Sequence, residues 1–241
     1  VAPSQLNIYH QIEINSVQDI NKLCTNVDSG TIEVRYKGES NYTTIDIQNV
    51  ESIAINDDIN VNQLNDNFLR GCQWASTIDI TGIKGVTTIG DNFLYDFGAD
   101  ITNSGALAPD INFSSLSSVE TIGNDFYHTA CSMNKVDLTP LINLTTVGDN
   151  FLYMCANKTT VDMSTCVKLT TIGDGLLAYS NELIDFYVPL KDTPPSVGQS
   201  EFMDGVDRCT IHAGQYANAY KAAPVWTTWT DNIDGQTPPT T

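Results

Sequence analysis

One histidine and one cysteine stand close enough in the chain to suggest nucleophilic chemistry, His128 and Cys131. A neighbouring imidazole can activate a thiol by accepting its proton. Cys131, however, lies close to a place that Cys72 and Cys155 occupy in other copies of a repeat described below. A thiol in that place is interpreted as a small apolar side chain of the core. The chain also has no zinc-protease, nucleophile-elbow or P-loop motif, so we expect no enzymatic activity.

Metal-ligand patterns are equally weak. Asp58 and Asn60 match the start of a calcium-binding loop, but Gln63 stands where that loop needs glycine and Leu69 where it needs a bidentate glutamate. The six cysteines form no Cys-x-x-Cys pair. Cys166 takes a place that leucine or isoleucine fills in other copies, and we interpret it as core, with a disulfide to another repeat as the alternative. We expect neither a metal site nor a cofactor.

A row of acidic residues is the constellation that stands out. Short apolar-x-apolar phrases recur along the chain, and because side chains alternate along a strand, the middle residue of each phrase is expected to face solvent. These middle residues are Asp46, Asp79, Asn112, Asp137, Asp162 and Asp185. In strands about 4.8 Å apart, neighbouring carboxylates repel by about 1 kcal/mol even in water, which is tolerable when they are hydrated.

The row has more than one interpretation. It could be a solvated face copied by duplication, or a binding face for a basic or hydroxyl-rich partner, with divalent cations bridging the row as a third reading. Flanking residues Thr77, Lys135, Thr160 and Tyr187 would help a binding face. The candidate ligand-binding residues are Asp79, Asn112, Asp137, Asp162, Asp185, Lys135, Thr160 and Tyr187.

An internal repeat positions these residues. A second phrase, apolar-Gly-Asp or a close variant, is anchored at Leu64, Ile89, Ile122, Val147 and Ile172, with spacings of 25, 33, 25 and 25 residues. The single long interval places an insertion within residues 97–111, and a fixed period with one longer member is typical of a repeat array. Ile45-Asp46-Ile47 is interpreted as an earlier, degenerate copy.

The spacing of apolar residues within one repeat predicts how each copy folds. From Val136 onward they alternate once and then recur every three or four residues, which indicates one short strand followed by a coil around a narrow core. One such turn cannot cover its own apolar face, so the turns must stack. We expect the most extensive sheet to consist of parallel strands around Ile78, Ile111, Val136, Val161 and Ile184. Phe93, Phe126 and Phe151 should stack inside, as should Ile89, Ile122, Val147 and Ile172.

The repeats resemble a known family. Lys158 to Asp174 is similar to the leucine-rich repeat, and Val147 to Cys155 is similar to its BspA-like branch. The segment from Pro194-Pro195 to Trp226 resembles the closing part of BspA-like proteins. The resemblance covers roughly Asp46 to Ile233, although serine or threonine follows the concave strand where the family usually has proline. It implies an α/β leucine-rich-repeat solenoid with one parallel sheet on the concave face.

Both ends carry patterns typical of caps. Ser16 can cap a helix whose apolar face begins at Val17, and the alternating stretch that follows at residues 31–37 predicts a strand. Tyr216, Ala219, Tyr220 and Ala223 share one helical face. We divide the chain into a strand-helix-strand cap (1–44), the leucine-rich repeats (45–190), a C-terminal repeat and cap (191–234) and a linker or tail (235–241).

Charge limits the partners. A net charge of −18 repels nucleic acid and anionic lipid, and no apolar run is long enough to cross a membrane. The resemblance implies a secreted or surface-displayed module, adhesin-like, that recognises a protein or glycan on a host or neighbouring cell. The alternative is a structural component, such as a virion decoration or cell-envelope spacer.

Overall fold

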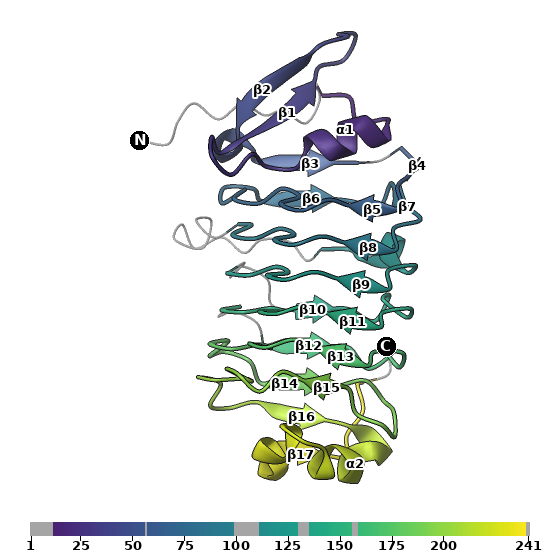
Figure 1. Ribbon diagram of the computed structural model, residues 1–241, viewed down its shortest axis with the longest axis vertical. Coiled ribbons are helices and arrows are strands. Elements are labelled where there is room, and N and C mark those ends of the chain that lie inside the picture. The colour runs from purple at the N-terminus through teal and green to yellow at the C-terminus, as the bar shows by residue number, and fades with distance from the viewer. Residues whose placement is uncertain (1–11, 56, 99–110, 130–134, 156–158, 240–241) are drawn as a thin grey trace.

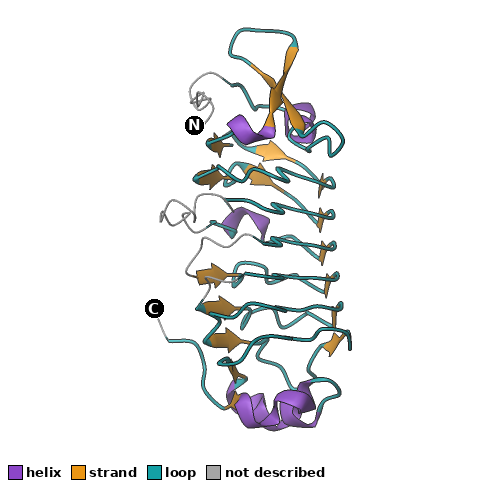
Figure 2. Cartoon of the chain, turned by 90° about the vertical axis from the view of Figure 1, so that its left-hand side faces the viewer, coloured by secondary structure: helices purple, strands orange, loops and turns teal. Residues whose placement is uncertain are grey.

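The computed structural model describes residues 12–55, 57–98, 111–129, 135–155 and 159–239. The chain winds into a stack of turns that runs nearly straight, with the N-terminal elements at one end and the C-terminal helices at the other (Figures 1 and 2). The parallel repeat architecture that the sequence predicted is confirmed, because every strand pair within the stack is parallel.

One side of the stack carries a five-stranded parallel sheet, here called sheet A. Its strands follow the order β10 (Lys135–Asp137), β12 (Thr160–Asp162), β14 (Asp185–Tyr187), β16 (Thr210–His212) and β17 (Ile233–Asp234). The pair β3 (Ser52–Ala54) and β6 (Thr77–Asp79) lies above it in the same column (Figure 1). Between them Ile111 and Phe113 are buried as expected, but their segment forms no strand.

A second sheet, here called sheet B, has one strand more than sheet A, although sheet A contains more residues. The predicted sheet is divided, because Ile78 pairs in β3–β6 outside sheet A and Ile111 forms no strand. Sheet B has six strands, β5 (Gln63–Leu64), β8 (Thr88–Ile89), β9 (Thr121–Ile122), β11 (Thr146–Val147), β13 (Thr171–Ile172) and β15 (Ser196–Val197). Each is two residues long, too short to show the alternation by which strands are found in a sequence. A further pair, β4 (Ile59–Asn60) and β7 (Ile83–Lys84), lies between the two sheets in the chain.

The strand pairing corrects two assignments in the acidic row. Val161 pairs with Phe186, so Tyr187 lies beside Asp162, and Asp185 lies beside Thr160. The sequence alignment had placed Ile184 beside Val161, but Ile184 is 49% exposed. A shift of two residues preserves the alternation of a strand, so the pattern alone could not distinguish the two alignments.

Asp46 is the second correction, because it belongs to no repeat strand of sheet A. It ends β2 (Tyr42–Asp46), which pairs in antiparallel fashion with β1 (Thr31–Arg35). The partner of Ile78 is Ile53 instead, and Ala54 takes the place of the acid. Ile45-Asp46-Ile47 therefore is not the first copy of the phrase, and its alternation reflects the hairpin.

A spine of phenylalanine rings fills the stack between the sheets. Phe126 is fully buried and stacks on Phe93 at 5.2 Å and on Phe151 at 5.1 Å between ring centroids. Phe68 extends the spine by one turn, stacking on Phe93 at 5.6 Å. The predicted stack of Phe93, Phe126 and Phe151 is confirmed, and the pairing of sheet B confirms the column of Ile89, Ile122, Val147 and Ile172.

The bend that follows each sheet B strand uses an unusual backbone. Alternate residues there have positive φ, for example Tyr127 at 54° and Leu152 at 58°. A left-handed conformation costs about 1–2 kcal/mol for a residue with a side chain. The bends persist because their N–H groups bond to neighbouring turns: Tyr127 N donates to Phe93 O at 2.8 Å and Leu152 N to Phe126 O at 3.1 Å. Stacking therefore stabilises a backbone that one isolated turn would not adopt.

A charged network holds the N-terminal cap. Asp19 in α1 (Val17–Lys22) is 3% exposed and binds the Arg35 guanidinium, with Nη2 to Oδ2 at 3.0 Å. Ser16 Oγ and Tyr42 Oη donate to the same carboxylate at 2.7 and 2.8 Å. Burial raises the pKa of Asp19, but the hydrogen bonds from Arg35, Ser16, the Asn15 amide and Tyr42 outweigh it and lower the pKa to about 2. The short helix η2 (Ile47–Asn49) follows the cap.

Aromatic packing closes the other end. The closing elements are η5 (Gly214–Tyr216), α2 (Ala217–Ala222) and η6 (Trp226–Asn232), and one further short helix, η4 (Ser114–Leu116), lies within the repeats. Trp226 is fully buried and donates from Nε1 to Pro195 O at 2.9 Å, and Tyr220 Oη donates to Pro189 O at 2.7 Å. The buried rings satisfy their polar atoms against the last turns, which fixes the cap on the stack.

Candidate ligand-binding groove

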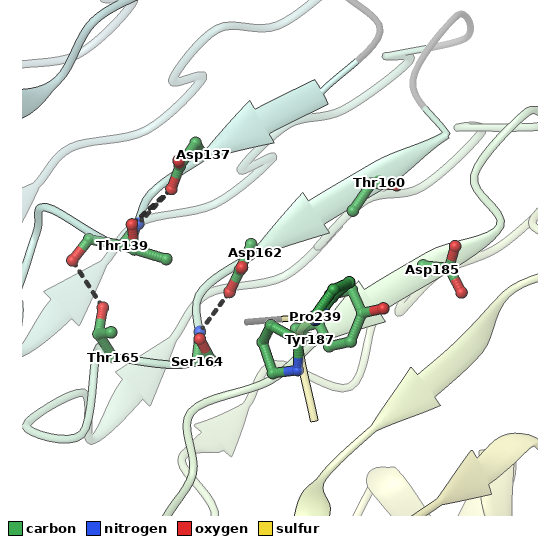
Figure 3. A pocket seen from close by; sticks show the side chains of 10 residues that line it. Asp137, Thr139, Thr160, Asp162, Ser164, Thr165, Asp185, Tyr187 and Pro239 are labelled. Atoms are coloured by element: carbon green, nitrogen blue, oxygen red, sulfur yellow. Dashed lines mark hydrogen bonds between the residues drawn. The ribbon is translucent and has the colours of Figure 1, made fainter. Parts of the chain in front are cut away.

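A groove of about 620 Å³ lies on the outer face of sheet A. Five of the predicted ligand-binding residues line it, and Figure 3 shows them on three successive strands. These are Asp137, Thr160, Asp162, Asp185 and Tyr187. The remaining lining residues were not predicted, namely Thr139, Ser164, Thr165, Pro238 and Pro239. Carboxylates and hydroxyls side by side can accept hydrogen bonds from ammonium, guanidinium, amide or hydroxyl groups.

The strand ends fix the acids of the groove. Asp137 Oδ1 accepts hydrogen bonds from Thr139 N at 3.0 Å and from Thr139 Oγ1 at 2.6 Å. Asp162 Oδ1 accepts a hydrogen bond from Ser164 N at 3.0 Å. Figure 3 shows the contacts of Asp137 with Thr139 and of Asp162 with Ser164. An aspartate that binds the amide two residues on forms an Asx turn, which bends the chain away from the strand. These carboxylates therefore have a local structural task besides any contact with a ligand.

Exposure along the row is uneven. Asp137 is exposed, whereas Asp162 is only 6% exposed, although the alternation of the strand predicted a solvent-facing side chain at both positions. Tyr187 lies beside Asp162 on the next strand, and two prolines from the C-terminal segment line the same groove. The groove is thus open at its Asp137 end and covered around Asp162.

A histidine between two carboxylates stands next to the covered end. His212 is 4% exposed, its Nε2 lies 2.7 Å from Asp185 Oδ1, and its Nδ1 lies 2.8 Å from Asp234 Oδ1. Its ring stacks on Tyr187 at 4.5 Å between centroids. The cluster ties β14, β16 and β17 together. His212 was not among the predicted site residues, and its place one period after Tyr187 was the available signal.

The segment after β17 turns back along sheet A (Figure 2). Gly214 N donates to Gln236 O at 2.9 Å, and Gln236 N donates to Asp234 Oδ1 at 3.0 Å. Gly214, with φ of 56°, lies so close to the segment that an added Cβ would come within 3.1 Å of Thr237 Cγ2. From there Pro238 and Pro239 reach the groove.

The other predicted site residues lie outside the groove. Asp79 and Asn112 belong to turns nearer the N-terminus, where each forms the same local turn: Thr81 N donates to Asp79 Oδ1 and Ser114 N to Asn112 Oδ1, both at 2.9 Å. Lys135 is part of β10, but its side chain lies outside the described ones. Asp79 and Asn112 therefore do not line this groove.

A column of rings at the surface was also missed. Arg70 lies over the Tyr95 ring at 4.6 Å, and His128 stacks between Tyr95 and Tyr153 at 4.6 Å on each side. Burial lowers the pKa of His128, against the charges of Asp96 and Asp125. Its Nδ1 is buried without a hydrogen-bond partner. Because each ring face is covered by the next ring, this column stabilises the stack and leaves little ring face for a ligand.

The thiols of the described part are structural. Cys72, Cys155, Cys166 and Cys209 are buried. Cys166 forms no disulfide, and burial raises its pKa to about 12. The disulfide alternative for Cys166 is therefore wrong. Cys131, the proposed partner of His128, lies outside the described residues. Within the described ranges no three His, Cys, Asp or Glu side chains are grouped as metal ligands would be, and no helix there is long and apolar enough to cross a membrane.

Parallel strands stacked turn upon turn around one apolar spine define a solenoid repeat protein. Within this class, residues 107–205 match the family model described as the BspA type leucine rich repeat region, in six copies, and this part of the chain belongs to that family. Such repeats are generally protein-binding modules of surface or secreted proteins, and typically they are not catalytic. No curated protein matches the chain.

Proposed function

We propose that this chain is a non-catalytic binding module, secreted or displayed at a surface, that recognises a protein or glycan on a host or neighbouring cell. The groove on sheet A carries this proposal. It gathers carboxylates and hydroxyls from three strands in one depression, whereas the rest of the row is spread along the stack. Asp137, Thr160 and Thr165 supply the acceptors and donors that a polar ligand needs.

Charge supports a basic or hydroxyl-rich partner. The chain carries 29 acidic against 11 basic side chains, and three of the acids line the groove. Attraction across such a surface raises the rate of association more than the final affinity, and it weakens as salt is added. Binding through the groove should therefore slow down at higher ionic strength.

The test is to replace Asp137 and Asp162 together by asparagine. Asparagine keeps an acceptor oxygen for the Asx turns, as Asn112 does one repeat earlier, so the change removes charge and leaves the fold. The matched control replaces Asp91 and Asp149, which follow strands of sheet B, by asparagine. Asn124 already occupies the equivalent position in the turn between them. Both variants are compared with the parent on a glycan array and on immobilised extracellular-matrix proteins, at low and moderate salt.

We expect the Asp137→Asn/Asp162→Asn variant to bind more weakly than the parent and to lose most of the salt dependence, while its melting temperature stays within a few degrees. The control should bind as the parent does. Equal losses in both variants would show that net charge, not the groove, is responsible. Unchanged binding by the sheet A variant would contradict the proposal.

A second candidate function has its own observation. Asp79, Asn112, Asp137 and Asp162 all form local turns, which is sufficient reason for an acid or amide at these places without any ligand. This favours a structural component, such as a virion decoration or cell-envelope spacer, whose repeats build a stiff rod. Such a protein should lose no binding on neutralisation of the row.

A further inference from the structure

The C-terminal segment forms part of the wall of the groove. Gln236 is held by one backbone hydrogen bond from Gly214 N and by the Asp234 side chain, and Thr237 packs over Gly214. Beyond Thr237 the chain continues as Pro238 and Pro239, which line the groove together with Tyr187 and Asp162. Two consecutive prolines therefore fit against the tyrosine and the acids on this side of the groove.

We propose that Gln236–Pro239 is an intramolecular cover of the groove, and that the external ligand is an extended, proline-containing polypeptide segment with a basic residue beside its prolines. This inference rests on the proposed function, because it assumes that the groove binds a partner. It adds the chemical class of that partner and a competition with the chain's own tail.

The tail is a poor chemical match for the groove that it covers. Proline has no backbone N–H, so Pro238 and Pro239 offer no donor to the carboxylates around them. Neither residue carries charge, although Asp137, Asp162 and Asp185 line the same groove. A lysine or arginine next to the prolines of a competing segment would supply the missing donors and positive charge. Such a segment should displace the tail.

The tail is also weakly held at its tip. Gln236, Thr237 and Pro239 are exposed, and Pro238 is half-buried. Among the described residues, the hydrogen bonds of the segment end at Gln236, whereas its start is fixed by β17 and the Asp234–His212 contact. Release of the tip therefore requires no disruption of sheet A, and a short tether keeps its effective concentration near the groove high.

The experiment compares the full chain with a chain that ends at Gly235, which keeps β17 and the His212 cluster. The probe is the blocked, dye-labelled pentapeptide Gln-Thr-Pro-Pro-Lys, which copies Gln236–Pro239 and adds a lysine. Two control peptides replace both prolines by alanine or the lysine by glutamate. Fluorescence anisotropy gives Kd. A full-length Pro238→Gly/Pro239→Gly variant tests the same point should the shortened chain lose its cooperative thermal unfolding.

We expect the shortened chain to bind the probe at least about tenfold more tightly than the full chain, because a cover that is closed about nine-tenths of the time raises the apparent Kd by that factor. The alanine peptide should not bind, and the glutamate peptide should bind more weakly. Tyr187→Ala in the shortened chain should abolish binding, whereas Tyr179→Ala, an exposed aromatic of another face, should not alter it.

Equal Kd values for the full and shortened chains, and for the Pro→Gly variant, would overturn the intramolecular cover. Failure of every variant to bind the probe at millimolar concentration would overturn the proline ligand class. The array experiment with Asp137→Asn/Asp162→Asn does not depend on either result, so failure of this inference is distinguishable from failure of the proposed function.

Discussion

Sheets A and B use the same side chain in opposite ways. In sheet A, Asp137 bonds to an amide two residues further along its own turn. In sheet B, Asp149 Oδ1 accepts from Asp174 N at 2.9 Å, on the next turn, and Asn124 Oδ1 accepts from Asp149 N at 2.8 Å. The first contact shapes one turn, and the second ties consecutive turns together. The Asx turns of Asp137 and Asp162 therefore connect no neighbouring turns, whereas Asp185 does so through His212.

The difference also explains the glycine of the apolar-Gly-Asp phrase. A Cβ on Gly148 would approach the carbonyl carbon of Gly123 to 2.7 Å and Asn124 N to 2.8 Å, and Gly90, Gly123, Gly173 and Gly198 face the same obstruction. The inter-turn side chain of Asn124 occupies the space in which a side chain on residue 148 would lie. Sheet B therefore depends on a Gly-Asx pair, while sheet A needs only the Asx residue.

The largest effect should come from the spine that both sheets share. Phe126→Ala should lower the free energy of unfolding by about 3–5 kcal/mol, because the ring is fully buried between Phe93 and Phe151 and the stack cannot close the cavity. Chemical denaturation followed by circular dichroism measures it. A loss below about 1 kcal/mol would mean that the ring contributes little to the core.

Gly148→Ala should have the next largest effect. It should lower the free energy of unfolding by about 1–3 kcal/mol, the range for forcing a group into a packed site. The matched control is Gly235→Ala, where an added Cβ meets only Gly214 O at 3.5 Å. The control should change stability by less than about 0.5 kcal/mol. Similar losses at both positions would contradict the role assigned to the sheet B glycine.

Asp149→Ala and Asp137→Ala compare the two tasks of aspartate directly. Each acid has an asparagine one repeat before it and an aspartate one repeat after it, so relief of charge repulsion is matched. Asp149→Ala removes an inter-turn hydrogen bond to a carboxylate and should lower the free energy of unfolding by about 1.5 kcal/mol. Asp137→Ala should lower it by about half of that. Asp149→Asn should restore most of the loss. A larger loss at Asp137 would reverse the comparison.

Much of this fold could be predicted from the sequence, because stacked turns must repeat their core. The recurrence of Phe93, Phe126 and Phe151 predicted the spine, and the apolar-Gly-Asp phrase predicted the column of sheet B. The partner of each aspartate could not be predicted. A repeat shows which residue recurs, but not whether its carboxylate faces an amide of its own turn or of the next.

The groove shows a second limit. Strand alternation predicted Asp137 and Asp162, and Thr160 was predicted as a flanking residue. Asp185 was misplaced by two residues, because a two-residue shift keeps every side chain on the same face. The prolines of the tail have no periodicity, so the sequence predicted only a linker or tail there. Their position depends on contacts of Gln236 and Thr237 with Gly214, which no local pattern encodes.

The smallest predicted effect concerns the ring column, which both sheets leave at the surface. His128→Tyr should leave stability near pH 8 within about 1 kcal/mol of the parent, because tyrosine fills the same place in two neighbouring turns and the unpartnered Nδ1 is removed. The useful readout is the dependence on pH. Burial lowers the pKa of His128 in the folded protein, against Asp96 and Asp125 and helped by Arg70.

The unfolded chain therefore binds more protons at this histidine once pH falls below its ordinary pKa of 6.5, so stability is lost as pH falls through that value toward the lower folded pKa. Tyrosine does not titrate there, and His10 and His212 are present in both proteins. The free energy of unfolding of the variant, relative to that of the parent, should rise as pH falls from about 8 to about 5. Denaturation at each pH measures it. A constant difference across that range would show that His128 titrates alike in the folded and unfolded chain.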